Sequence, residues 1–299
     1  NAILQGQMES VLKNRNAGDT GMLLILAPET FTGGVVTNDV GRSRTYRRFR
    51  SYLSDYQDVN LLFGASAYSY LFSGNAPSAT ARNVGEGQWV ESHNSALIID
   101  GKDNAEIYHK SKLVVGVEMT PYPAFFCKID NLLGGVMGRC IGQDEVSLLH
   151  CVASDSTGHI TKSIPLGCAI CYESVYPEHC AEYARAGAEA LVVITNDAWW
   201  GDTPGYRQHL RYSSLRAIET RRDIARSANT GISAFINQRG DIVSHTAWWE
   251  PAVLTGSVNL NDSETFFVRQ GDIIGRMCAF FSILLLLGVV VRARITRQE

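Results

Sequence analysis

The pattern most informative about the fold lies in residues 164–195, which read IPLGCAICYESVYPEHCAEYARAGAEALVVIT. Residues 164–171 and 190–195 are short apolar runs typical of buried strands. Residues 178–186 between them have the pattern of a helix. A strand, a helix and a further strand in this order favour an α/β fold with a largely parallel sheet.

The same alternation of strands and helices continues on both sides of this stretch. The remaining expected elements are a helix at 3–12, a strand at 22–27, a polar helix at 44–58, strands at 59–67 and 94–100, a long helix at 206–229, and a hairpin of 232–237 with 241–246. Residues 121–162 show no clear period, which in a stretch this long is typical of a functional loop or lid.

The composition excludes several classes of protein. With 299 residues, of which 45% are hydrophobic and 19% are charged, the chain can bury a large core, so disorder and coiled coil are excluded. The formal charge of −3 gives no electrostatic case for a nucleic-acid partner. The seven cysteines are an odd number, and they form no His-Cys cluster at a zinc-like spacing. A disulfide framework is therefore not expected, although one bridge among Cys127, Cys140 and Cys151 stays open.

The C-terminal part of the chain has the pattern of a membrane helix. Residues 277–291 contain no charge, and the apolar run extends back to Ile273 with only Arg276 inside it. About twenty apolar residues cross a bilayer, so we expect a transmembrane helix at 273–292. A buried core helix is the alternative. The basic tail at 293–299 favours the cytoplasmic side, which places the domain at 1–265 outside the cytoplasm. Because the sequence begins at Asn1, with no Met and no signal pattern, we expect a longer natural chain.

Three segments place reactive side chains at the ends of predicted strands. Glu29 follows the apolar run at 22–27, Lys110 lies in the segment YHKSKL, and Cys171 ends the strand at 164–171. Taken singly, each has an ordinary explanation: a surface carboxylate, a solvated lysine and a buried structural cysteine. Taken together, they supply a base, a fixed cation and a nucleophile. A Cys-His pair using His109 or His179 is the alternative, but neither histidine has an Asn or Asp orienter at a recognisable spacing.

The order of Glu29, Lys110 and Cys171 resembles the Glu-Lys-Cys triad of the nitrilase, or carbon-nitrogen hydrolase, superfamily. Further segments are similar to its apolipoprotein N-acyltransferase branch: TNDAWWGD at 195–202, QH at 208–209, RAIE at 216–219, ANTGIS at 228–233 and RQGD at 269–272. Glu118 lies eight residues beyond Lys110, a spacing kept in the family, which selects Lys110 over Lys112 as the catalytic lysine. The segment at 113–117 lacks the proline that the family usually has there.

The resemblance implies a four-layer α-β-β-α catalytic domain, followed by the C-terminal transmembrane helix. In the family this domain faces the periplasm from the bacterial inner membrane and follows an N-terminal membrane bundle that this chain does not contain. The implied reaction moves an acyl chain from a phospholipid, through a thioester on Cys171, to the α-amino group of a diacylglyceryl-modified cysteine at the start of an apolipoprotein. Glu118, Tyr172 and Glu173 are implied to support the site, and no metal or organic cofactor is implied.

Two other functions stay open at this point. A membrane-tethered amidase or nitrilase would hydrolyse a small C–N substrate through the same acyl-enzyme, with water in place of the amine. A non-catalytic module could bind lipoproteins, although an intact triad argues against it. The apolar C-terminal segment and the pair Trp199-Trp200 favour the acyltransferase, because Trp is enriched at membrane interfaces.

Overall fold

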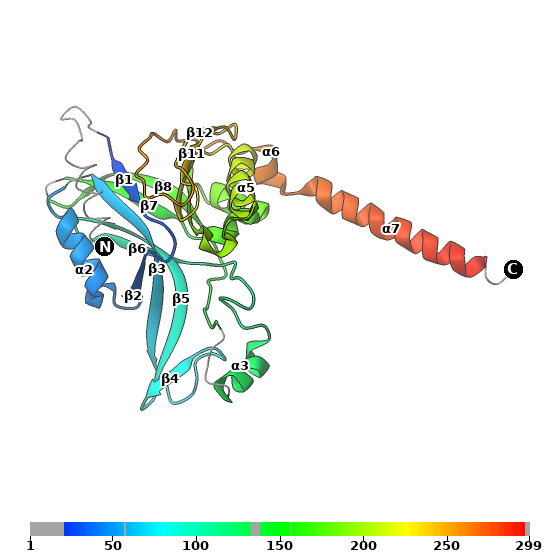
Figure 1. The fold of residues 1–299 in the computed structure, drawn as a ribbon, viewed down its shortest axis with the longest axis horizontal. Helices are drawn as coiled ribbons and strands as arrows, with labels where there is room; N and C mark the ends of the chain where they lie inside the picture. Colours follow the sequence, from blue (N-terminus) through cyan, green and yellow to red (C-terminus); the bar gives the residue numbers. More distant parts are fainter. Residues whose placement is uncertain (1–20, 57, 133–137, 156, 297–299) are drawn as a thin grey trace.

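The computed structural model describes residues 21–56, 58–132, 138–155 and 157–296. Two six-stranded sheets pack face to face, and helices cover their outer faces (Figure 1). This is the expected four-layer α-β-β-α sandwich. The helix expected at 3–12 lies outside the described residues.

The first sheet is built around two long antiparallel strands, β3 (Val59–Phe72) and β5 (Gln88–Asp100). Its other strands are β1 (Leu23–Leu26), β2 (Thr32–Val36), β4 (Arg82–Gly85) and β6 (Ala105–His109). Strands β1 and β2 both pair in parallel with β3, one after the other along its length, whereas β4 and β6 pair antiparallel with β5. The chain therefore leaves the sheet between β1 and β2, where Glu29 lies.

The second sheet has the order β12-β11-β10-β9-β8-β7. Its strands are β7 (Leu149–Ser154), β8 (Ile160–Ile170), β9 (Ala190–Asn196), β10 (Ile224–Asn229), β11 (Ala234–Ile236) and β12 (Ile242–His245). The neighbours β8, β9 and β10 are parallel, and the outer pairs are antiparallel. The prediction of a largely parallel sheet is therefore wrong: both sheets are mixed, because hairpins extend each parallel core.

Alternate residues of β3 separate the two faces of the first sheet. Leu61 and Phe63 pack in a cluster with Leu53 of helix α2 (Arg44–Leu53), whereas Leu62 packs in the core between the sheets. The side chain of Asn60 also joins the sheets, since it donates to the Val152 carbonyl at 2.8 Å and accepts from the Val152 amide at 3.0 Å. Such a pair satisfies polar groups that would otherwise be buried without partners.

The remaining helices are α3 (Pro123–Leu132), α4 (Pro177–Arg185), α5 (Gly205–Thr220), α6 (Phe266–Gln270) and α7 (Ile273–Ile295), with short 3-10 turns η1 (Val40–Arg42), η2 (Cys171–Val175) and η3 (Asp197–Trp200). Helices α4 and α5 contribute Tyr183 and Leu210 to the core at the second sheet. The expected strands at 164–171 and 190–195, the helix at 178–186 and the hairpin are confirmed to within a few residues.

Two further sequence predictions are wrong. The long helix expected at 206–229 ends at Thr220, because Arg221 adopts a left-handed conformation with φ of 53°, and residues 224–229 form β10. The region 121–162, expected to lack regular structure, contains α3, β7 and the start of β8. Strand β10 forms by pairing in parallel with β9, whereas β7 pairs with β8 in a hairpin.

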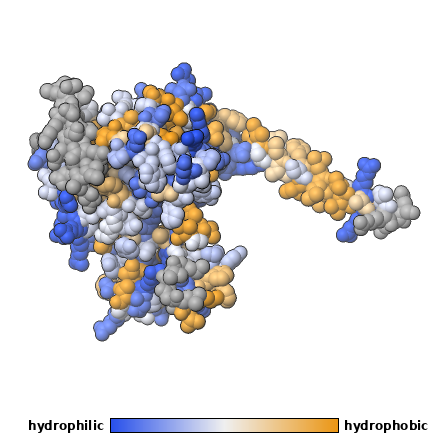
Figure 2. Space-filling model, in the orientation of Figure 1, coloured by the Kyte–Doolittle hydropathy of each residue, from blue (hydrophilic) through white to orange (hydrophobic). Residues whose placement is uncertain are grey.

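Helix α7 leaves the domain as a single apolar rod (Figures 1 and 2). With 23 residues, the helix is long and apolar enough to cross a membrane, and its apolar stretch is not buried against the other described residues. Within the described part of the chain, α7 is therefore not the buried core helix that was the alternative. Val268 of α6 is buried against Ala181 and Ala184 of α4, and Arg276 of α7 forms an ion pair with Glu178.

Candidate active site

Glu29 is buried at the break between β1 and β2, with 5% of its surface exposed. Its Oε1 accepts a hydrogen bond from Asn94 Nδ2 at 2.7 Å, and its Oε2 accepts from the Asn196 amide at 2.9 Å. Gly64 of β3 allows the chain to pass here, because a Cβ on Gly64 would lie 2.5 Å from the Glu29 Cα. The carboxylate is therefore not a surface group but a buried and fully bonded one.

Lys110 directly follows β6 and is 1% exposed. Its Nζ lies 3.1 Å from Glu29 Oε1 and 2.9 Å from Glu118 Oε1. Burial acts to lower the pKa of this ammonium, but the nearby Glu29, Cys171 and Glu118 outweigh burial and hold the pKa above its usual range. Lys110 is therefore a fixed cation between two carboxylates, whereas the side chain of Lys112 is exposed.

Asn94, in the middle of β5, is a site residue that the sequence analysis missed. Its Nδ2 donates to Glu29 Oε1 at 2.7 Å and to Glu118 Oε1 at 2.6 Å, and its backbone carbonyl accepts from the Lys110 backbone amide at 2.8 Å. The amide group thus holds both carboxylates around the ammonium. The available signal was an Asn at the start of an apolar run, NSALIID at 94–100.

Cys171 directly follows β8 and begins η2 with a positive φ of 53°, a conformation that costs a residue with a side chain about 1–2 kcal/mol. Burial and the charge of Glu29 raise the pKa of its thiol to about 12, while Lys110 and the Thr195 hydroxyl lower it. At neutral pH the thiol keeps its proton. A nucleophilic role for Cys171 therefore requires a neighbouring base.

Glu173 joins the Cys171 turn to the Lys110 segment. It is fully buried, and its Oε2 accepts from the Ile170 amide at 2.8 Å. Its Oε1 accepts from the amides of Ser111 and Lys112 at 2.6 and 3.1 Å and from the Tyr108 hydroxyl at 2.6 Å. Burial acts to raise the pKa of this carboxyl, but the hydrogen bonds, with His179 foremost, hold the pKa below its usual range.

Tyr172 and the two histidines considered as alternatives lie around this centre. The Tyr172 ring is 37% exposed and packs edge to face against Tyr176. The His109 ring stacks on His93 and bonds to Ser95. Nε2 of His179 lies 3.4 Å from Glu173 Oε1. The structure thus brings Glu29, Lys110 and Glu118 into direct contact, and it gives neither histidine the position of a base for Cys171.

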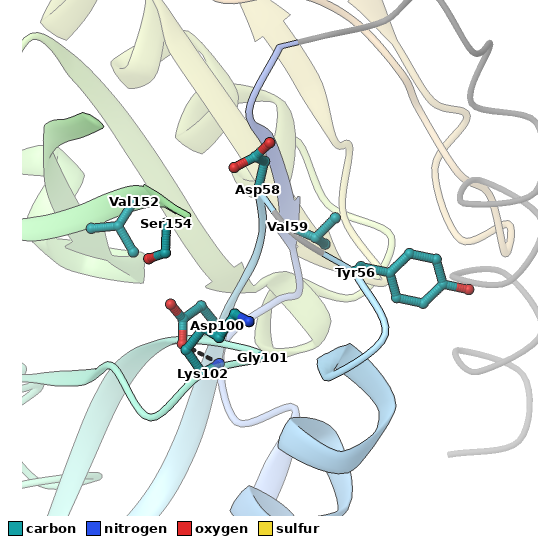
Figure 3. Close-up of a pocket in the computed structure, with 8 residues that line it drawn as sticks. All are labelled: Tyr56, Asp58, Val59, Asp100, Gly101, Lys102, Val152 and Ser154. Carbon is teal, nitrogen blue, oxygen red and sulfur yellow. Dashed lines mark hydrogen bonds between the residues drawn. The ribbon is translucent and has the colours of Figure 1, made fainter. Parts of the chain in front are cut away.

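No disulfide joins Cys127, Cys140 and Cys151, which are free, as are the other four cysteines. A small hollow, drawn in Figure 3, is lined by Asp58, Val59, Asp100 and Ser154 among others. It lies at the end of β5, six residues from Asn94 along the strand, and so it is separate from the Lys110 centre.

Comparisons with known proteins identify the family of the chain. The family model described as "Carbon-nitrogen hydrolase" matches residues 5–266. Apolipoprotein N-acyltransferase of Chlorobaculum tepidum is 32% identical over 203 residues, which are 67% of this chain and 37% of the relative. The protein of the same name from Bdellovibrio bacteriovorus is 32% identical over 254 residues, 79% of this chain and 43% of the relative. The chain thus spans about two fifths of the length of these relatives.

Solved structures of the nitrilase superfamily share the fold. An amidase from Nesterenkonia sp. AN1 superposes with a TM-score of 0.52 at 18% identity, covering 86% of this chain and 84% of the amidase. Nit3 of Saccharomyces cerevisiae superposes with a TM-score of 0.53 at 15% identity, covering 84% of this chain and 81% of Nit3. Since the family model also spans both sheets and every residue of the candidate site, the chain belongs to the carbon-nitrogen hydrolase family.

Proposed function

We propose that this chain transfers an acyl group from a phospholipid to the α-amino group of the diacylglyceryl-modified cysteine at the start of a lipoprotein. The observation that carries the proposal is the buried ammonium of Lys110, held 3.1 Å from Glu29 and 2.9 Å from Glu118 beside a protonated thiol. The names of the relatives support the choice of acceptor.

In the first half of the reaction Glu29 takes the proton of the Cys171 thiol, and the thiolate attacks the ester carbonyl of the phospholipid. Lys110 stabilises the oxyanion that forms, an effect worth about 3–4 kcal/mol for one well-placed donor. The C–O bond then breaks, and the lysophospholipid leaves with the proton from Glu29. A thioester remains on Cys171.

In the second half the neutral amine of the acceptor attacks the thioester carbonyl. Glu29 takes a proton from the attacking nitrogen, the C–S bond breaks, and the proton returns to the Cys171 sulfur. Glu118 and Asn94 keep Lys110 in place, and Glu173 holds the Cys171 turn against the Lys110 segment. We assign Tyr172 to the rim of the site, where its exposed ring can meet acyl chains.

Both substrates carry acyl chains, so the reaction belongs at a bilayer surface. We propose that α7 crosses the membrane, with the arginines after its apolar run on the cytoplasmic side and the catalytic domain in the periplasm. On this proposal the residues at 293–299 form a basic cytoplasmic tail.

Mass spectrometry of the intact protein tests the chemistry directly. After incubation with phospholipid vesicles, the wild-type protein should gain the mass of one acyl chain, and Cys171→Ala should gain none. Adding a peptide that starts with diacylglyceryl-cysteine should remove the mass and give an N-acylated peptide. Release of free fatty acid, with no acylated peptide, would instead support a hydrolase.

A further inference from the structure

A second buried polar cluster lies next to the backbone of Cys171, and the proposed acyl transfer does not use it. Asp197, His209 and Arg226 are 1%, 2% and 3% exposed. His209 Nδ1 lies 2.8 Å from Asp197 Oδ1, and Arg226 Nη2 lies 2.8 Å from Asp197 Oδ2. Burial acts to raise the pKa of Asp197, but these two partners hold it below its usual range, so the carboxyl is ionised. Asp197 is therefore a fixed acceptor for the His209 ring.

The cluster ends on the backbone of the candidate nucleophile. His209 Nε2 lies 3.1 Å from the carbonyl oxygen of Cys171, and the hydroxyl of Ser174 donates to the same oxygen at 2.7 Å. This carbonyl belongs to the residue with φ of 53°. Two contacts thus converge on the carbonyl of one of the two peptide groups that flank the Cys171 Cα and set the direction of its side chain.

Both ring nitrogens of His209 face hydrogen-bond acceptors. Nδ1 faces the Asp197 carboxylate and Nε2 faces a carbonyl oxygen, and both of these groups only accept. The Ser174 hydroxyl gives its single proton to the Cys171 carbonyl, so it has none to give to Nε2, 3.1 Å away. Acceptors thus face both ring nitrogens, the Asp197 carboxylate at Nδ1 and the Cys171 carbonyl at Nε2, while Arg226 Nη2 also lies 3.3 Å from Nδ1.

The three residues Ser174, His209 and Asp197 have the spacing of a serine hydrolase triad, but the surroundings exclude that role. Ser174 is fully buried, and its proton is directed at the Cys171 carbonyl. A nucleophilic serine must instead reach the substrate and give its proton to the histidine.

We propose that His209 is a positioning residue for the nucleophile: by holding the Cys171 carbonyl, it fixes the left-handed backbone from which Sγ reaches the acyl carbonyl. Asp197 orients the ring, and Arg226 holds Asp197. This inference rests on the proposed function, because it assigns His209 to the formation of the Cys171 thioester.

Two substitutions of His209 separate this contact from simple packing. The amide nitrogen of a glutamine can take the place of Nε2, so His209→Gln keeps the donor to the Cys171 carbonyl. The shorter asparagine can replace only Nδ1, so His209→Asn keeps the bond to Asp197 and loses the bond to the Cys171 carbonyl. Both variants remove similar buried ring surface. Their stabilities should therefore fall together, whereas their effects on Cys171 should differ.

The measurements use the full chain in detergent: thioester formation from a short-chain activated ester, and alkylation of Cys171 by iodoacetamide followed by intact mass. His209→Asn should lower kcat roughly 10- to 100-fold with KM unchanged, as a misplacement of about 1 Å does. His209→Gln should stay within about fivefold of wild type, since it keeps the donor. Alkylation should follow the same order. Equal rates for the two variants would overturn the proposal.

A matched control and a second variant complete the test. Asp223→Asn, at the far end of β10, removes a buried carboxylate that binds Asn259 and should lower stability without changing the rate. If His209→Asn does not fold, Ser174→Ala removes the other donor to the same carbonyl, and an unchanged alkylation rate in that variant overturns the proposal. Alkylation needs no acyl donor, so a wild-type protein that forms no thioester counts against the proposed function alone.

Discussion

The Lys110 ammonium lies 3.1 Å from the Glu29 carboxylate, although 81 positions separate the two residues in the sequence. Both groups are almost completely buried, so neither can exchange its partner for water. Removing Lys110 would leave the buried Glu29 and the mostly buried Glu118 without their cation, and the loss of one partner of a buried ion pair typically costs about 3–5 kcal/mol. The pair therefore links the stability of the fold to the chemistry of the site.

The two lysines of the YHKSKL segment should behave differently. Lys110→Arg should lose activity about 10²–10³-fold, because the wide guanidinium cannot occupy the space of an ammonium between two carboxylates and beside the oxyanion. Lys112→Ala should keep most activity, since that side chain is exposed and its backbone amide still donates to Glu173. Rates of thioester formation compare them. Equal losses would mean that the loop conformation matters and no single ammonium does.

The left-handed backbone of Cys171 predicts a trade of stability against activity. Cys171→Ala and Cys171→Gly should both be inactive, but Cys171→Gly should be more stable than Cys171→Ala by about 1 kcal/mol, because glycine has no Cβ to strain at positive φ. Thermal unfolding of the two variants measures the difference.

Cys168 provides the opposite case on the same strand. It is fully buried within β8, where a glycine weakens the strand, so Cys168→Gly should be less stable than Cys168→Ala by about 0.5–1 kcal/mol. Cys168→Ala itself should cost about 1 kcal/mol and keep normal turnover. A selective loss of turnover in Cys168→Ala would instead indicate that Cys168 is the nucleophile.

The bonds of Glu173 predict a loss of activity without contact to substrate. In Glu173→Gln an NH2 group replaces one carboxylate oxygen and faces a backbone donor, either Ile170 or the pair Ser111 and Lys112. Leaving buried donors unpaired costs about 1–3 kcal/mol. We expect a lower melting temperature and at least about a tenfold lower kcat, since Lys110 and Cys171 lose their common support. Glu182→Gln, a half-exposed carboxylate on α4, is the control.

The stacked pair of His93 and His109 predicts sensitivity to acid. Burial, together with the charge of His93, lowers the pKa of His109 to about 4 from its usual 6.5. Because the folded chain then binds fewer protons at this ring than the unfolded chain, acid favours unfolding. The stability should be constant above pH 6.5 and fall by about 2 kcal/mol as the pH drops from about 6.5 to 4, allowing for partial solvent screening. Melting curves of wild type and His109→Asn should converge at low pH if this ring is responsible.

The sequence predicts the parts of the fold whose residues carry their own signal. The second half of β8, residues 166–170, and strand β9 are apolar runs because both of their faces are buried, and α4 begins at Pro177, a residue favoured in the first helical turn. Strand β10 is different: it contains Arg226, whose burial depends on Asp197 from another segment. No local pattern identifies such a strand, and the preceding helical period was extended through it.

The candidate site shows the same division. Glu29, Lys110 and Cys171 could be proposed because reactive side chains stand at strand ends in a recognisable order. Asn94 was missed, and His209 was marked only within a family-like segment and given no role, because the importance of both lies in bonds to residues far along the chain. An Asn in an apolar strand was a usable sign. A histidine within a polar helix was not.

The last prediction concerns α7. Deleting residues 273–299 should leave a folded domain, because α6 stays packed on α4 through Val268 and the candidate site residues lie in other elements. The truncated protein should still form a thioester with a short-chain activated ester, since that step needs only the site. With phospholipid in vesicles its activity should fall at least about tenfold, because the domain no longer stays at the bilayer surface where the acyl donor lies.

Arg276→Ala is the matched control for this deletion. It removes the ion pair with Glu178 but keeps the apolar helix, and an exposed pair of this kind contributes only about 0–1 kcal/mol. Its activity on vesicles should therefore stay within about threefold of wild type.

A reporter fused after Glu299 should behave as cytoplasmic, while an external protease should cut within 121–162. If the truncated protein instead keeps full activity on vesicles, α7 does not hold the enzyme at its substrate, and a hydrolase acting on small soluble substrates becomes the better explanation of the site.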